Sequence, residues 1–183
     1  YIRDGLLFVH TMKNKNFAPK IVLGVDGGWT AKAVISELVE DAHYLCTRIL
    51  ANWDLLNVIP GLAEKNAAFK ARYGTDMTSI TLPTYQAMWV LYYAIEEAGK
   101  TANPANLEEF RTALRDALRN INLPADELVM PWDGVQFDEK GQNIKGRSTV
   151  AQVSPEDGKY HTVWPEEYAT MELIFPMPPW NER

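Results

Sequence analysis

The sequence lacks several features that would assign it to a functional class at once. It contains one cysteine, Cys46, which excludes an internal disulfide and any metal site built from several cysteines. No apolar run approaches the roughly 20 residues that a membrane-spanning helix needs. Basic residues are fewer than acidic ones: the sequence has 18 lysines and arginines and 24 aspartates and glutamates, which gives a net charge of -6. We therefore expect no nucleic acid as a partner.

Catalytic and metal-binding motifs are also missing. The three histidines, His10, His43 and His161, lack the short ligand spacings of zinc sites, so we expect no bound metal. No serine lies in a Gly-x-Ser-x-Gly turn, and no Gly-x-Gly-x-x-Gly segment indicates a dinucleotide. Cys46 lies in a predicted strand, where we expect a buried and inert thiol. These observations favour a chain that is not an enzyme and that carries no cofactor.

The first third of the chain alternates between strands and helices. Helical spacing of apolar residues predicts a helix over 2–15, and Pro19 separates it from a buried, parallel-type strand over 21–25. A helix over 31–39 and a strand over 44–50 follow. This order is typical of a parallel sheet with crossover helices, so we expect an α/β fold.

The remainder is predicted to be helical first and strand-like later. The helix over 82–98 has Pro83 in its first turn and apolar residues on most sides. We therefore expect it to be buried, with the stripe Trp89, Tyr92 and Tyr93 in the core. The other expected elements are helices over 63–73 and from Asn103-Pro104 onward, a strand over 135–137, and a hairpin of 150–153 and 159–164 around the turn 155–158.

The segment Lys20-Ile-Val-Leu-Gly-Val-Asp-Gly-Gly-Trp-Thr30 is the most informative part of the sequence. In an open α/β sheet, ligands bind in the crevice outside the carboxyl ends of the strands, where this strand-to-helix turn would lie. Asp26 would present a carboxylate there, Gly27 and Gly28 would let a ligand approach the backbone, and the next helix would offer free N–H groups to an anion. That mixture fits a zwitterionic ligand. Alternatively, Asp26 is a turn residue bonded to its own backbone, and the glycines are plain turn formers.

Taken in order, these landmarks resemble the C-terminal half of the type I periplasmic binding proteins of the leucine/isoleucine/valine type, the solute receptors of ABC transporters. The resemblance covers essentially the whole chain. Its matching pieces are Tyr1 with the helix that leads through Pro19 into 24–28, the helical segments 83–88 and 94–99, and the segments 132–143 and 158–165.

The resemblance implies parts of two Rossmann-like three-layer lobes that close over a small ligand by hinge bending. Residues 1–52 would belong to the second lobe, residues 53–146 would return to the first lobe, and residues 147–183 would cross back. The leading strands of the N-terminal lobe, with the hydroxyl groups that hold the ligand's carboxylate, are missing from this sequence.

The resemblance also implies the residues at the ligand. Tyr1 matches an aromatic residue that lines the cleft, and Asp26 matches an acidic position that pairs with the ligand's ammonium group. Trp29 would form a wall, although it could equally cover the start of its own helix. Ile80 matches a cleft-edge position, although a lone apolar residue is usually part of the core. Tyr85 lies on the helix expected to be buried, where the sequence favours core packing over contact with the pocket. The full set expected at the ligand is Tyr1, Asp26, Gly27, Gly28, Trp29, Ile80 and Tyr85.

The function that this resemblance implies is an extracytoplasmic receptor for branched-chain amino acids or related small polar compounds. Its partners would be the small-molecule ligand and the membrane permease of an ABC importer, and its location would be periplasmic. We expect that a signal peptide has been removed or that the chain is a piece of a longer one. Such a piece would expose surfaces that a homo-oligomer or a swapped dimer could bury. The alternatives are a cytosolic amide or amino-acid sensor on the same scaffold, and a nucleotide-using α/β enzyme.

Overall fold

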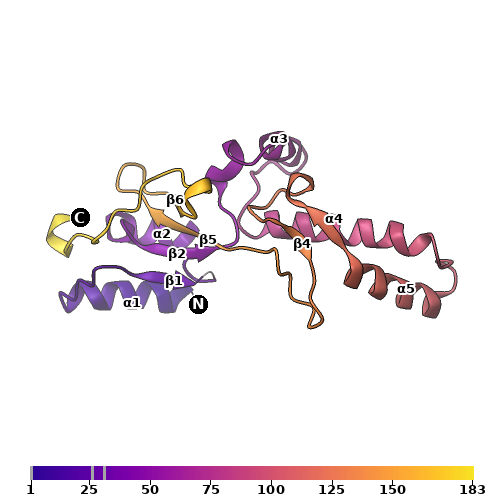
Figure 1. Ribbon diagram of the computed structural model, residues 1–183. Helices are drawn as coiled ribbons and strands as arrows, with labels where there is room; N and C mark the ends of the chain where they lie inside the picture. The colour runs from indigo at the N-terminus through magenta and orange to yellow at the C-terminus, as the bar shows by residue number, and fades with distance from the viewer. Residues whose placement is uncertain (1, 26, 31) are drawn as a thin grey trace. The chain divides into compact units, whose positions relative to one another are not determined.

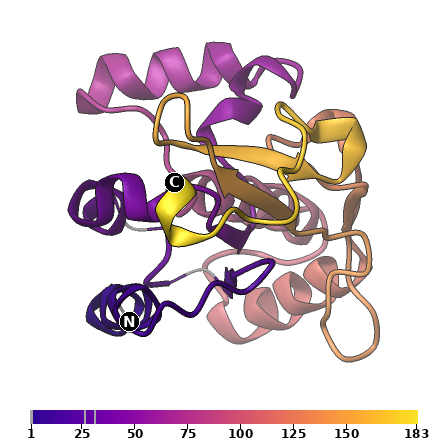
Figure 2. The same cartoon turned by 90° about the vertical axis from the view of Figure 1, so that its left-hand side faces the viewer.

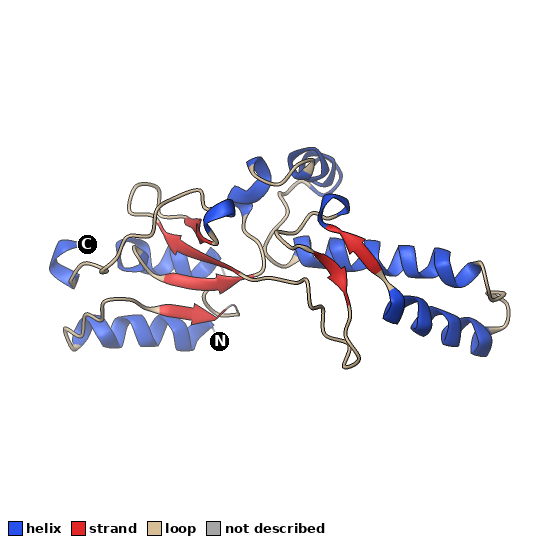
Figure 3. Ribbon diagram, viewed as in Figure 1, coloured by secondary structure: helices blue, strands red, loops and turns tan. Residues whose placement is uncertain are grey.

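The computed structural model describes residues 2–25, 27–30 and 32–183, and Figure 1 shows their helices and strands. These residues form two compact units. Unit 1 consists of the residues up to Val58 together with Ser148–Arg183, and unit 2 consists of Ile59–Arg147. Each unit combines helices with strands (Figure 3), so the expected α/β class is confirmed. Among the described residues, no helix is both long and apolar enough to cross a bilayer.

Unit 1 contains a four-stranded sheet in the order β1-β2-β5-β6. Strands β1 and β2 are parallel and are connected through α2, which confirms the predicted crossover, and β5 and β6 form the predicted hairpin. The sheet is mixed, because β5 runs antiparallel to β2. The helices and strands of the unit are α1 (Ile2–Asn14), β1 (Leu23–Val25), α2 (Lys32–Leu38), β2 (Cys46–Ile49), β5 (Thr149–Val153) and β6 (Tyr160–Trp164), and its 3-10 turns are η1 (Val39–Ala42), η2 (Trp53–Asn57), η4 (Glu166–Tyr168) and η5 (Trp180–Glu182).

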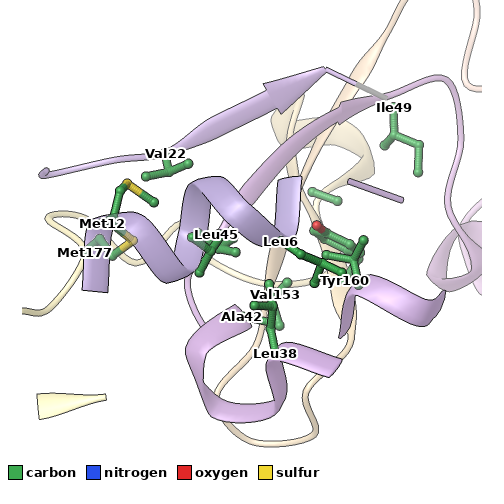
Figure 4. Close-up of a cluster of buried hydrophobic side chains, with 13 residues drawn as sticks. Leu6, Met12, Val22, Leu38, Ala42, Leu45, Ile49, Val153, Tyr160 and Met177 are labelled. Carbon is green, nitrogen blue, oxygen red and sulfur yellow. The ribbon is translucent and has the colours of Figure 1, made fainter. Parts of the chain in front are cut away.

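The core of unit 1 lies between this sheet and the helices α1 and α2. Leu6, Val9 and Met12 recur at helical spacing along α1 and pack into one apolar cluster with Leu45 of the loop before β2. Figure 4 shows the same cluster with Met177 of the C-terminal segment beside Met12. Apolar burial of this kind is the main source of folding free energy, so it fixes both helices on one face of the sheet.

Strand β1 is less buried than the sequence predicted. It lies at the edge of the sheet, and its side chains alternate between the two faces. Val22 and Gly24 are buried on the helix side, whereas Leu23 and Val25 are 52% and 66% exposed. The apolar run correctly predicted a parallel strand, but it could not show that only one face is covered.

The segment that follows β2 is held on β6 by three consecutive polar side chains. The side chains of Asn52 and Trp53 both donate hydrogen bonds to the carbonyl oxygen of Tyr160, at 2.7 and 2.9 Å. The buried carboxylate of Asp54 accepts hydrogen bonds from the backbone N–H and the hydroxyl of Thr162, the latter at 3.0 Å, and from the hydroxyl of Thr170. The chain is therefore fixed to unit 1 just before unit 2 begins.

Unit 2 consists of three helices and a short antiparallel pair of strands. Its elements are α3 (Leu62–Tyr73), α4 (Thr81–Gly99), α5 (Leu107–Asn120), β3 (Asn122–Pro124), the 3-10 turn η3 (Ala125–Glu127) and β4 (Gly134–Gln136). Helix α3 ends at Tyr73, as the sequence predicted, and Gly74 caps it in the left-handed conformation. Helix α5 begins three residues later than predicted, because the side chain of Asn106, rather than Asn103-Pro104, caps it. Strand β3 has no alternating pattern, and the sequence did not predict it.

Helix α4 is buried on one face and not on most sides as predicted. Its buried residues recur at i, i+4 spacing and include Leu82, Gln86 and Val90. The opposite face exposes Met88, Trp89, Tyr92 and Ile95, with Met88 60% exposed. The interpretation of Trp89 and Tyr92 as core residues was therefore wrong, while Tyr93 does pack against the core cluster. The aromatic rings contact one another along this face, with the Trp89 and Tyr92 centroids 5.4 Å apart.

We predict that Asp54→Ala destabilises unit 1 by about 3 kcal/mol, because it leaves the buried N–H and hydroxyl of Thr162 without the acceptor they have in Asp54 and removes a hydrogen bond of the Thr170 hydroxyl. Hydrogen exchange of the β5 and β6 backbone amides measures this loss separately from unit 2. Glu37→Ala removes an exposed acid of α2 as a matched control and should change stability by less than about 0.5 kcal/mol. Equal protection in both variants would contradict the importance of the Asp54 contacts.

Candidate functional site

A recess of about 400 Å³ lies in unit 1 at the carboxyl end of β1. One wall comes from α1 and the other from the end of β1 and the turn that follows it. Three of the residues expected at a ligand, Gly27, Gly28 and Trp29, line this recess together. Among the described residues, the lining consists of Asp4, Gly5, Phe8, Val25, Gly27, Gly28 and Trp29. The geometry matches the strand-end position where α/β sheets bind ligands.

The two glycines have different surroundings. Gly27 has a φ of +55°, which a residue with a side chain adopts at a cost, and a Cβ added there would contact nothing within 4 Å. Glycine is therefore favoured at position 27 by the backbone conformation of the turn, and not because a side chain would clash with a neighbouring atom. Gly28 is buried, and its carbonyl oxygen lies 3.9 Å from the position of a Cβ at Gly5. The turn thus brings its backbone close to α1.

Trp29 forms both a wall of the recess and part of the core. Its ring lies against Gly24 of β1 so closely that a Cβ at Gly24 would be 2.3 Å from the ring. The ring also meets Phe8 edge to face, with centroids 6.1 Å apart, and it packs on the core cluster of unit 1. Trp29 therefore lines the recess and packs on the core of unit 1, and its contact with a ligand stays a prediction.

Tyr160 of β6 fixes the backbone at Trp29. Its hydroxyl donates a 3.0 Å hydrogen bond to the carbonyl oxygen of Trp29. Burial raises the pKa of this hydroxyl, with a further contribution from Cys46. The hydroxyl therefore stays protonated and keeps its role as donor.

Of the expected site residues that the structure describes, Ile80 and Tyr85 do not line this recess. Tyr1 and Asp26 lie outside the described residues. Ile80 and Tyr85 belong to unit 2, where Ile80 precedes α4 and is 70% exposed. Tyr85 is half-buried on α4 and contacts the edge of Trp89, with centroids 6.2 Å apart. Ile80 is thus not a core residue, and Tyr85 is only partly one.

Sequence reasoning missed two side chains of the recess, Asp4 and Phe8. They lie one helical turn apart on α1, so they share a face of that helix. An acid and an aromatic residue at i, i+4 spacing were a detectable signal. The face that they share was predictable, but its position beside the Gly27-Gly28 turn was not.

A larger groove of about 1030 Å³ lies in unit 2 between α4 and α5. None of the expected site residues lines it. Its sides carry acids from both helices, including Glu96, Glu97 and Glu108, above alanines such as Ala98 and Ala113. We assign the candidate site to the smaller recess, because that recess combines the strand end, the glycine turn and aromatic walls.

Two side chains of reactive types, Cys46 and His161, lie outside the recess. Cys46 is buried, and burial raises the pKa of its thiol to about 11, so it is protonated and inert at neutral pH. His161 Nε2 lies 3.1 Å from the carboxylate of Asp157. Within residues 2–25, 27–30 and 32–183, no group of three or more His, Cys, Asp and Glu side chains is placed to hold a metal ion.

Comparison with known proteins finds relatives that match nearly the whole chain. No protein-family model matches it. A Leu/Ile/Val-binding protein homolog from Brucella abortus is 28% identical over 182 residues, which are 96% of this chain and 42% of that protein. The chain therefore spans less than half the length of this relative. The resemblance to the leucine/isoleucine/valine-binding proteins that the sequence indicated is confirmed by this match.

Solved structures show the same fold. A leucine-binding protein from Thermotoga maritima superposes with a TM-score of 0.66 and 21% identity, over 88% of this chain and 41% of that chain. A putative branched-chain amino acid ABC transporter protein from Silicibacter pomeroyi superposes with a TM-score of 0.70 and 16% identity, over 96% of this chain and 45% of that chain. The chain thus has the fold of part of a type I periplasmic binding protein.

We predict that Gly24→Ala forces the ring of Trp29 away from β1, because the added methyl group would overlap it. Tryptophan emission and near-ultraviolet circular dichroism should change, and stability should fall by about 1–3 kcal/mol. Gly5→Ala is the matched control in the same recess, because its methyl group would make only an ordinary contact with the carbonyl oxygen of Gly28. It also replaces a glycine within a helix by a better helix former, so it should not lower stability. Identical spectra for Gly24→Ala and the parent chain would refute this packing.

Proposed function

We propose that this chain is the C-terminal part of an extracytoplasmic solute receptor that binds leucine or a related branched-chain amino acid for an ABC importer. The observation that carries the proposal is the match to a Leu/Ile/Val-binding protein homolog over 96% of the chain. The superpositions on a leucine-binding protein and on a branched-chain amino acid transporter protein support it. None of these proteins is named as an enzyme or as a sensor, so those alternatives are not carried forward.

The recess of unit 1 supports this function through its chemistry. An amino acid needs a partner for its ammonium group and an apolar wall for its side chain. Asp26, which lies between Val25 and Gly27 in the sequence, is proposed to pair with the ammonium group, and Trp29 with Phe8 is proposed to contact the apolar part. Gly27 and Gly28 leave room for the ligand beside the backbone.

Three further residues of this chain are proposed to contact the ligand. Tyr1 is proposed to pack over the aliphatic side chain, and Ile80 and Tyr85 are proposed to face the ligand from the first lobe. Units 1 and 2 are proposed to belong to the second and first lobes, respectively. The ligand's carboxylate would be held by residues beyond this sequence, and the permease in the membrane would be the receptor's partner in the periplasm.

Calorimetric titration with leucine tests the function. The longer protein that contains this chain should bind leucine, isoleucine or valine saturably. This chain alone should give no measurable heat, because pockets normally bury about 70–90% of a small ligand and the chain supplies only part of the pocket. A longer protein that binds none of the three amino acids would contradict the function. Micromolar binding by the monomeric chain would contradict the need for the rest of the pocket.

We predict that Asp26→Asn in the longer protein weakens leucine binding about 10- to 100-fold, because a hydrogen bond to a charged group contributes about 1.5–3 kcal/mol. Glu37→Gln removes the same charge from an exposed position on α2 and should change the dissociation constant less than about two-fold. If Asp26→Asn binds leucine as well as the parent protein does, the assigned role of Asp26 is wrong.

A further inference from the structure

Tyr160 of β6 bonds to two distant segments of unit 1 through opposite ends of the same residue. Its hydroxyl donates a 3.0 Å hydrogen bond to the carbonyl oxygen of Trp29, a wall of the recess. Its own carbonyl oxygen accepts hydrogen bonds from the side chains of Asn52 and Trp53, at 2.7 and 2.9 Å. These two residues belong to the exit segment, residues 52–58, which follows β2 and ends where unit 2 begins. Tyr160 therefore connects the candidate site to the exit segment.

This connection runs from one face of the sheet to the other. Helices α1 and α2 cover one face (Figure 2), and Tyr160 belongs to the core cluster on that face (Figure 4). Because side chains alternate along a strand, those of Lys159 and His161 point to the opposite face. There the ammonium group of Lys159 lies 5.2 Å from the centroid of the Trp53 ring, and the His161 ring meets the same ring edge to face at 5.4 Å. The strand β6 thus holds the recess wall on one face and Trp53 on the other.

The surroundings of Tyr160 leave it little room to move independently. Tyr160 is 7% exposed, and it lies opposite Val153 in the antiparallel pair of β5 and β6. If a ligand displaces the backbone of Trp29, Tyr160 either loses the acceptor of its hydroxyl or moves with that backbone. A buried hydroxyl without an acceptor costs free energy, so the movement is favoured. Because the carbonyl oxygen of Tyr160 is bonded to the exit segment, the movement reaches that segment.

We propose that Tyr160 is a positioning residue of the ligand site, which holds the turn Gly27-Gly28-Trp29 in its binding conformation and couples that turn to the exit segment. A turn that already has its binding conformation loses less conformational freedom when the ligand binds, so the affinity is higher. Contact of the ligand with the turn then also changes the surroundings of Trp53, which lies outside the recess. This inference deepens the proposed function and rests on it, because the ligand is the amino acid that the receptor binds.

Fluorine NMR tests the connection in the longer protein without any ligand. The protein is labelled with 5-fluorotryptophan, and the resonance of Trp53 is assigned by its loss in Trp53→Phe. Tyr160→Phe removes only a hydroxyl group, which does not touch Trp53, and it should nevertheless shift the Trp53 resonance. Tyr168→Phe is the matched control, because it removes the same group from η4, a half-buried part of the same unit outside the recess. It should leave the resonance unchanged.

Leucine titration of the same proteins tests the role of Tyr160 in binding. Leucine should shift the Trp53 resonance of the parent protein. Tyr160→Phe should bind leucine about 3- to 10-fold more weakly, since one hydrogen bond that positions the turn is lost. At saturating leucine, the shift of the Trp53 resonance should also be lost in this variant. A tyrosine that only stabilised the fold would leave that shift in place.

Two tryptophan variants test the same connection from its other end. Trp53→Phe removes the 2.9 Å hydrogen bond to the carbonyl oxygen of Tyr160 and should weaken leucine binding about three-fold or more. Trp180→Phe is the matched control, since the indole N–H of Trp180 also donates at 2.9 Å to a backbone carbonyl oxygen of unit 1, that of Phe17. Neither Trp180 nor Phe17 lines the recess, so this variant should change the dissociation constant less than about two-fold.

Three outcomes would overturn the proposal. An unchanged Trp53 resonance in ligand-free Tyr160→Phe would refute the connection. Parental leucine affinity in Tyr160→Phe, or a leucine-induced shift of the Trp53 resonance that persists in it, would refute the positioning role. Equal affinities of Trp53→Phe and Trp180→Phe would do the same, and this pair decides if Tyr160→Phe does not fold. A parent protein that binds none of leucine, isoleucine and valine refutes the receptor function, while the ligand-free resonance still decides the connection.

Discussion

The buried carboxylate of Asp54 is the constraint on which the arrangement of unit 1 depends. A buried acid is tolerated only when its oxygens are hydrogen-bonded, and Asp54 is satisfied by Thr162 and Thr170, more than 100 residues later in the sequence. Asn52 adds a bond to the carbonyl oxygen of Tyr160. The strand pair β1-β2 and the hairpin β5-β6 are therefore tied together at the point where the chain leaves for unit 2.

The same hairpin also orients the candidate site. While the carbonyl oxygen of Tyr160 holds the segment after β2, its hydroxyl holds the backbone of Trp29. Trp29 in turn is confined between Gly24 and Phe8. This hydrogen-bonded connection from Asn52 to Trp29 holds one wall of the recess in place within unit 1.

Several local features were predictable because they depend on residues close together in the sequence. Helix α1 follows from apolar spacing, α3 is capped by a left-handed glycine, and the β5-β6 hairpin follows from the turn at 155–158. Burial was predicted less well. The apolar residues of β1 and the aromatic stripe of α4 are exposed, because a pattern shows which side chains share a face and not whether anything covers that face. In the candidate site, the Gly27-Gly28-Trp29 turn was predictable, whereas Asp4 and Phe8 were not recognised.

The sequence alone determined the types of most elements, the parallel crossover and the resemblance to the leucine/isoleucine/valine-binding proteins. All three depend on the local spacing of apolar and turn residues and on the order of the segments along the chain. Only the tertiary structure decided which face of each element is covered, how Asp54 is satisfied, and that α1 forms a wall beside the glycine turn. The reason is physical: these properties arise from contacts between residues that are distant in sequence, and such contacts exist only once the sheet and its helices have packed.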